Sequence, residues 1–135
     1  MSNCSDLFLD YYQLTMSQSF WRKHGEKEAI FELSFRGLPK DRGYLITGGV
    51  ERCIQHIKNL SFSKESLDSL STLEKFDNSF LKHLQTIKFT GDVWAVRDGE
   101  IIFANEPVIQ VKAPIIQCQL IETILINTVN LHTLL

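Results

Sequence analysis

The feature that most constrains this fold is an apolar run at residues 114–135, long enough for about six turns of helix. An uninterrupted apolar run of about 20 residues is typical of a membrane span. Here polar side chains recur along the run, at Gln117, Gln119, Glu122, Asn127, Asn130 and His132. A lipid-spanning helix tolerates that polarity poorly, so the run predicts a buried helix of a globular protein and no membrane contact. Its Glu122, Asn127 and Asn130 are then expected to find hydrogen-bonding partners in the interior.

Upstream of this run, the chain shows both helical and extended patterns. Residues 10–23 and the stretch after Gly48–Gly49 repeat apolar positions at helical spacing, and residues 61–85 predict two short helices. Residues 29–36 alternate apolar and polar side chains with a period of two, which predicts a half-buried strand.

Four short β-type runs follow, at residues 87–89, 93–96, 100–104 and 108–111. Asp98–Gly99 separates the second run from the third, and this pair favours a tight hairpin because both residues tolerate positive φ. The pattern predicts a four-strand antiparallel meander. Because helices and strands are grouped rather than strictly alternating, we expect an α+β fold with a small, mostly antiparallel sheet.

Composition excludes several classes of protein. The chain has 135 residues, of which 44% are hydrophobic, and its 14 Lys plus Arg and 16 Asp plus Glu give a net charge of -2. Such a chain is not disordered as a whole, and it lacks the basic excess of a nucleic-acid binder. Its length suits one domain or part of one. The first ten residues carry no basic side chain and only a short apolar stretch, so we expect no signal peptide and a cytoplasmic protein.

The three cysteines and four histidines form no recognisable site. No CxxC, HxxxH or HExxH spacing is present, so we predict neither a disulfide framework nor a metal site. A P-loop, a nucleophile elbow and a dinucleotide-binding glycine motif are also missing from the sequence. Pattern alone leaves two classes: a non-catalytic binding or carrier module, or part of a larger enzyme. A carrier would place a lysine at the hairpin tip, where this chain has Arg97.

Three small groups of residues are candidates for ligand binding. Tyr12, beside Asp10 at the start of the first helix, can stack on a flat ring, or else pack in a core or interface with Asp10 as the helix cap. Arg36 and Arg42 flank a turn, where they either hold phosphate or remain solvated surface groups. Gly48–Gly49 precedes a helix, where close packing or a tight turn is favoured over a phosphate cradle because the P-loop lysine is missing.

Five short motifs carry a resemblance to a known family. The first is DYYQLTM at residues 10–16, which is close to the family opening TDLYQLTM. The others are FEL with RGLP at residues 31–39, RGYL with GG at 42–49, FTGDVWAV at 89–96, and QLIET with Leu125 and Asn127. They keep the family's order and spacing and cover nearly the whole chain. On these motifs the sequence resembles the N-terminal portion of nicotinate phosphoribosyltransferases.

The resemblance implies an activity, a fold and partners. The family joins nicotinate to 5-phosphoribosyl-1-diphosphate with coupled ATP hydrolysis and Mg²⁺, forming nicotinate mononucleotide and diphosphate for NAD synthesis. Its members are type II phosphoribosyltransferases several times longer than this chain, in which an N-terminal α/β domain sits beside an irregular α/β barrel. They form homodimers with active sites near the subunit interface. The implied partners are nicotinate, phosphoribosyl diphosphate and a second subunit.

Three residues take roles from the resemblance. Tyr12 matches the tyrosine that stacks on the nicotinate ring from the neighbouring subunit, and Asp10 matches the aspartate that supports this tyrosine. Arg36 resembles an arginine that reaches a phosphate of the sugar diphosphate. Tyr11 stands where the family usually has leucine and Leu9 replaces the usual threonine, so neither inherits a role.

The resemblance also implies what this chain lacks. The family's phosphorylated histidine, carboxylate-binding arginine and phosphoribosyl-binding loop match nothing here, so no residue of the chain is expected to be catalytic. ATP and Mg²⁺ would be bound mainly by residues outside the chain. We expect residues 1–113 to form the N-terminal domain, residues 114–135 to begin a helix that connects to the barrel, and the chain alone to be inactive. The alternatives are a nicotinamide-specific homologue and a stand-alone binding or interaction module.

Overall fold

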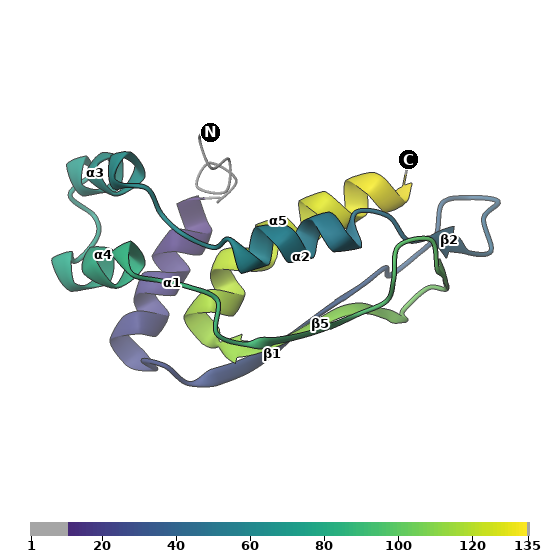
Figure 1. Ribbon diagram of the computed structural model, residues 1–135, viewed down its shortest axis with the longest axis horizontal. Coiled ribbons are helices and arrows are strands. Elements are labelled where there is room, and N and C mark those ends of the chain that lie inside the picture. Colours follow the sequence, from purple (N-terminus) through teal and green to yellow (C-terminus); the bar gives the residue numbers. More distant parts are fainter. Residues whose placement is uncertain (1–10, 135) are drawn as a thin grey trace.

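A three-stranded antiparallel sheet carries helices on one side in the computed structural model, which describes residues 11–134 (Figure 1). In chain order the elements are α1 (Tyr11–Lys23), β1 (Glu28–Ser34), β2 (Leu45–Ile46), α2 (Val50–Lys58), α3 (Lys64–Thr72), α4 (Asn78–Gln85), β3 (Asp92–Ala95), β4 (Ile101–Ile102), β5 (Pro107–Pro114) and α5 (Ile115–Leu134). The fold class is α+β, as the grouping of sequence patterns predicted.

The central strand of the sheet is β5, which lies between β1 and β3 in the order β1-β5-β3. Phe31 of β1 and Val93 of β3 both face Val111 of β5 across the two antiparallel ladders. Val111 is fully buried, whereas alternate residues of β1 are exposed. This alternation confirms the half-buried strand that the period of two predicted.

The predicted four-strand meander is wrong. Residues 87–89 form no strand, β3 pairs with β5, and β4 pairs with β2 in a separate two-stranded sheet. The Asp98–Gly99 turn itself forms, with Gly99 at φ +86° and the Glu100 N–H donating to the Arg97 carbonyl at 3.3 Å. A turn signal specifies only a local reversal of the chain. The two strands that leave this turn pair with different neighbours, because each ladder also depends on which apolar surfaces become buried together.

Helix α5 forms the centre of the core. It buries 11 of its 20 residues and packs against α1, α2 and β1, with Leu120 and Ile121 fully buried. In Figure 1 it runs beside α2 above the three-stranded sheet. These contacts confirm the prediction of a buried helix. None of the helices in residues 11–134 combines the length and apolar character that crossing a bilayer requires.

The polar residues of α5 divide into two groups. Gln117 is buried and its Oε1 accepts the Thr90 N–H at 2.9 Å, while Glu122 accepts a hydrogen bond from Gln119 at 2.8 Å. Asn127 and Asn130 are exposed, so the expectation that they lie in the interior is wrong. They lie in the second half of the helix, which the core covers on one side only.

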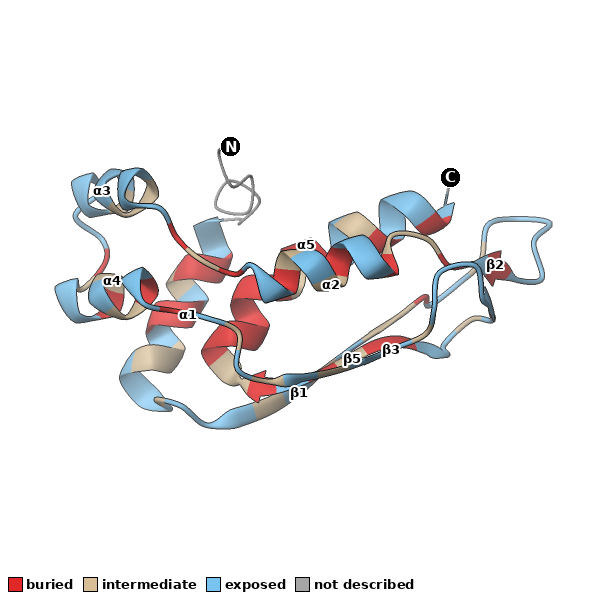
Figure 2. Cartoon of the chain, viewed as in Figure 1, coloured by how far each residue is buried: buried red, intermediate tan, exposed pale blue. Residues whose placement is uncertain are grey.

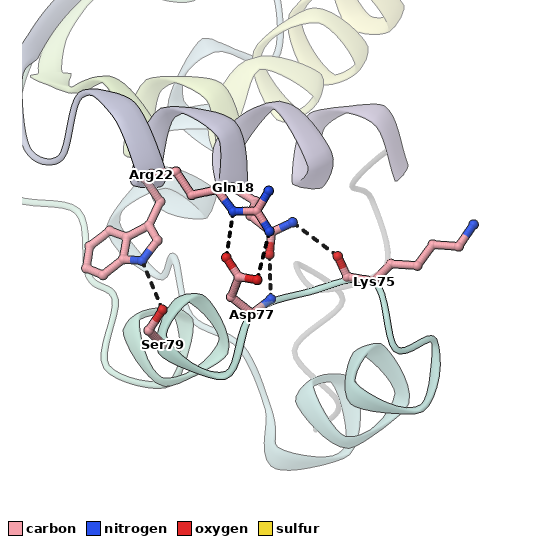
Figure 3. Close-up of polar contacts among 6 residues, drawn as sticks. Gln18, Arg22, Lys75, Asp77 and Ser79 are labelled. Carbon is pink, nitrogen blue, oxygen red and sulfur yellow. Dashed lines mark hydrogen bonds and ion pairs between the residues drawn. The ribbon is translucent and has the colours of Figure 1, made fainter.

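A cluster of polar contacts joins α1 to the loop before α4 (Figure 3). Gln18 donates through Nε2 to the Lys75 carbonyl at 3.1 Å and accepts the Asp77 N–H at 2.5 Å. The Arg22 guanidinium makes two hydrogen bonds to the Asp77 carboxylate, at 2.6 and 2.7 Å. Trp21 stacks on the His83 ring with centroids 4.3 Å apart. We call these contacts the α1–α4 clasp.

Candidate functional site

Tyr12, the predicted ring-stacking residue, lies in the first turn of α1. Its side chain is 51% exposed and makes no hydrogen bond or ring contact with any residue between 11 and 134. Met16, one turn further along α1, is also exposed, so the two side chains form an apolar ridge on one face of the helix. An exposed aromatic side chain without a partner is available to stack on a planar ligand.

The residues on both sides of Tyr12 are held in place. The Tyr11 ring packs edge-on against Phe76, with centroids 6.0 Å apart at 67°, and the Lys75 ammonium lies 6.0 Å from the Tyr11 centroid. Gln13 is fully buried and accepts a hydrogen bond from the Thr123 hydroxyl. The backbone at Tyr12 is therefore anchored, although its ring has no hydrogen bond or ring contact within residues 11–134. Asp10, the predicted supporting residue, lies outside the described residues.

Arg36 is exposed and lies two residues beyond the end of β1, where it makes no hydrogen bond or ion pair within the described part of the chain. It is thus available to bind an anion. The amino end of α1 and the segment after β1 are separated in Figure 1, so one copy of the chain does not bring Tyr12 and Arg36 together. Arg42 lines a different feature, an open pocket of about 540 Å³ that also includes Tyr44 and His132.

Gly48–Gly49 has a packing role. A Cβ on Gly48 would lie 2.8 Å from the His132 carbonyl oxygen, and one on Gly49 would lie 2.7 Å from the Thr128 carbonyl oxygen. Only glycine permits this approach of the backbone to α5, and Gly49 also adopts φ +75°. The favoured interpretation of this pair, close packing, is confirmed.

The amino end of α2 is occupied by a carboxylate from the same chain. Asp98 accepts the N–H groups of Val50 at 2.8 Å and Glu51 at 3.2 Å. These are first-turn donors that a bound phosphate would need, so α2 has no free phosphate cradle here. Sequence reasoning placed Asp98 only in a hairpin turn. Its role as a cap for α2 had no local signal, because the two segments are about 50 residues apart.

The described residues offer neither a metal centre nor a reactive thiol. No group of three or more His, Cys, Asp or Glu side chains within residues 11–134 is arranged to hold a metal ion. Burial raises the pKa of the Cys53 thiol to about 12 and that of the Cys118 thiol to about 11. Both cysteines are therefore protonated near neutral pH and behave as core side chains.

Comparison with known proteins identifies the family. A family model described as the nicotinate phosphoribosyltransferase N-terminal domain matches residues 7–130, a range that includes Tyr12, Gln13, Arg36 and Thr123. The chain belongs to this family. The resemblance drawn from the five motifs is confirmed.

Curated relatives agree with this assignment. The chain is 40% identical over 129 residues to nicotinate phosphoribosyltransferase pncB2 of Mycobacterium tuberculosis, covering 96% of this chain and 28% of that protein. It is also 40% identical over 130 residues to nicotinate phosphoribosyltransferase of Bacillus subtilis, covering 96% and 26%. The chain thus spans about a quarter of the length of these relatives.

Solved structures show the same fold. The crystal structure of human nicotinic acid phosphoribosyltransferase superposes with a TM-score of 0.81 at 28% identity, over 90% of this chain and 25% of the human one. The structure of nicotinate-nucleotide pyrophosphorylase from Pyrococcus furiosus gives a TM-score of 0.68 at 16% identity and supports the fold alone.

Proposed function

We propose that this chain supplies the ring-stacking part of a nicotinate phosphoribosyltransferase. The complete activity joins nicotinate to 5-phosphoribosyl-1-diphosphate and forms nicotinate mononucleotide and diphosphate for NAD synthesis, coupled to ATP hydrolysis. The observation that carries the proposal is Tyr12, a half-exposed aromatic residue inside the region that defines the family, with an anchored backbone and a ring that contacts no other ring within residues 11–134.

The chemistry of the two substrates fits a chain that supplies binding groups for them. Nicotinate is a flat anion, and an aromatic side chain stacked on its ring contributes about 0.5–1.5 kcal/mol beyond the burial of area. Diphosphate is the leaving group, and positive charge where its charge develops stabilises the transition state. Tyr12 provides the aromatic surface, and Arg36 provides one cation for a phosphate. Since neither side chain transfers a proton or forms a bond to substrate in this scheme, the chain contributes binding rather than catalytic groups.

ATP and Mg²⁺ belong to the proposed activity, but the described residues do not fit them. No acidic cluster suited to a metal ion occurs within residues 11–134, and Asp98 already occupies the amino end of α2. We therefore derive no step through either group from this chain.

A homodimer is part of the proposal. The outer side of α5 exposes three large apolar side chains, Ile126 at 42%, Leu131 at 58% and Leu134 at 39%. Together with the ridge of Tyr12 and Met16, these side chains offer apolar area that association would cover. In such a dimer Tyr12 of one subunit would face a substrate bound by the other.

A chimera tests the proposal. Residues 7–130 of this chain would replace the matched region of the Bacillus subtilis enzyme, and formation of nicotinate mononucleotide from nicotinate and phosphoribosyl diphosphate would be followed. We expect turnover with nicotinate, and a KM for nicotinate raised about tenfold by Tyr12→Ala because the stacking contact is lost. The 135-residue chain alone should show no turnover.

Two results would contradict the proposal. One is a chimera that has a folded circular dichroism spectrum, is dimeric by light scattering, and yet makes no product. The other is a Tyr12→Ala chimera with an unchanged KM for nicotinate.

A further inference from the structure

A buried polar seam lies between α1 and α5, on the inner side of the turn that carries Tyr12. We define the seam as Gln13 and Ser17 of α1 with Thr123 of α5, all of which are buried. The Thr123 hydroxyl donates to Gln13 Oε1. Gln13 Nε2 and Ser17 Oγ find no partner among the described residues. A buried polar group without a partner lowers the stability of the fold, so apolar residues would serve better if packing were the seam's only role.

The first turn of α1 needs an anchor because helix ends open readily. The first N–H groups of a helix have no partners within it, and terminal turns are among the first parts of a protein to unfold locally. The Tyr12 ring has no hydrogen bond or ring contact of its own among residues 11–134, so its position depends on its neighbours. Tyr11 is held by Phe76, and Gln13 is held by Thr123.

A hydrogen bond constrains this turn in a way that an apolar contact does not. Successive helix residues are rotated by about 100°, so a small rotation of α1 about its axis would turn the Tyr12 ring to another side. Apolar contacts are non-directional, whereas a fully buried hydrogen bond specifies one arrangement. The contact also joins two of the five family motifs, since Gln13 belongs to DYYQLTM and Thr123 belongs to QLIET.

We propose that Gln13, held by the Thr123 hydroxyl, is a positioning residue that sets the direction of the Tyr12 ring toward a bound pyridine. Gln13 acts through Tyr12 and touches no substrate, because it is 0% exposed. The inference rests on the proposed function and extends it to two buried residues that carry no role in the resemblance.

The first test uses the 135-residue chain and needs no activity. Thr123→Val is nearly isosteric and removes the hydroxyl donor, whereas Thr123→Ser keeps it. Chymotrypsin cleaves after exposed tyrosine and tryptophan, and mass spectrometry identifies the first cuts. With the cut after Trp94 as internal reference, we expect Thr123→Val to speed cleavage after Tyr11 or Tyr12 about tenfold, the equivalent of one lost hydrogen bond. Thr123→Ser should stay within about twofold of the unmodified chain. An unchanged ratio in Thr123→Val would overturn the anchoring step.

The second test uses kinetics in the Bacillus subtilis chimera. Thr123→Val should raise the KM for nicotinate about fivefold and leave both kcat and the KM for phosphoribosyl diphosphate within about twofold, since stacking contributes to binding of the ground state. In a Tyr12→Ala background the same substitution should have no further effect, because both changes remove one contact. Thr123→Ser should restore the KM.

The outcomes separate the two proposals. A folded chimera without turnover contradicts the proposed function. An active chimera in which Thr123→Val and Tyr12→Ala have additive effects contradicts only the positioning role, because a merely structural defect would act independently of Tyr12. Gln13→Met with Thr123→Val removes the hydrogen bond and fills the seam with apolar groups, which should preserve or raise stability. If that double variant keeps the unmodified KM for nicotinate, the positioning role is also overturned.

Discussion

Helices α5 and α3 are held in the fold by different means. Helix α5 buries 11 of its 20 residues, and its neighbours are α1, α2 and the sheet. Helix α3 buries none of its residues and packs against α4. Figure 2 shows the contrast, with a mostly red first half of α5 and a largely blue α3. A helix that buries apolar side chains over most of its surface is stabilised by the whole core, whereas α3 has no buried side chain and lacks this stabilisation.

Helix α4 buries Phe80 and Leu84 in the core, whereas α3 depends on directional contacts at its edges and on its packing against α4. Ser63 caps α3 by accepting the Ser66 N–H at 3.1 Å, and the α1–α4 clasp attaches the pair to α1 through Gln18, Arg22 and Asp77. Exposed polar contacts are individually weak and sensitive to pH and salt. We therefore expect α3 to open locally at a lower free energy than α5.

The largest effect should come from a matched pair of leucines. Leu120 in α5 is fully buried, and Leu73 at the end of α3 is 48% exposed. Leu120→Ala should lower the free energy of unfolding by about 2–5 kcal/mol because it leaves a cavity in the core. Leu73→Ala should lower it by less than about 0.5 kcal/mol. Urea unfolding followed by circular dichroism measures both, and similar losses would remove the distinction between the two helices.

A second pair of substitutions tests how tightly the sheet beneath α5 is packed. A Cβ on Gly91 would lie 2.3 Å from the Lys112 carbonyl oxygen, so Gly91→Ala forces β3 away from β5. We expect a loss of about 1–3 kcal/mol, as for other overpacked sites. Gly37→Ala is the control, since no heavy atom lies within 4 Å of a Cβ there. Thermal unfolding distinguishes the two, and equal stability of the variants would show that the sheet adapts.

The smallest effect is an acid-dependent weakening of the α1–α4 clasp. The hydrogen bonds from Arg22 lower the pKa of Asp77 below its usual value of 3.8. The stabilising contribution of this carboxylate is therefore fully present above about pH 3.8 and is lost as the pH falls through the lowered pKa. Hydrogen exchange at acid pH should show α4 losing protection before α5. In Asp77→Asn the clasp should already be weak at neutral pH and lose its acid dependence; an unaltered pH profile would contradict the assignment.

Much of the helix content followed from local patterns in the sequence. Helix α1 ends at Lys23, and Gly25 just beyond it adopts φ +56° as expected of a stop signal, while α2 begins after Gly48–Gly49. Pairing between strands did not follow. The Asp98–Gly99 turn predicted a hairpin, yet β3 pairs with β5 and Asp98 caps α2. The turn chemistry was correct, but hydrogen-bond partners far along the chain carry no signature in the turn itself.

In the candidate site, too, local sequence predicted some features and distant contacts decided the others. Sequence motifs singled out Tyr12 and Arg36, and the structure shows that both are exposed but lie in separate parts of one chain. Gln13 appeared in the same motif without a role. Its burial against Thr123 became visible only when α1 and α5 were in contact, across 110 residues.

The sequence by itself determined which segments are helical, that residues 29–36 alternate as a half-buried strand, where several helices begin and end, and that residues 114–135 prefer an apolar interior. These properties follow from residue spacing and backbone preference within a few turns of chain. Only the tertiary structure decided which strand pairs with β5, which carboxylate caps α2, and which buried group anchors the turn that carries Tyr12. Those choices depend on surfaces that meet across long stretches of chain, where the free energy of burying them together selects one arrangement among many that local preferences allow.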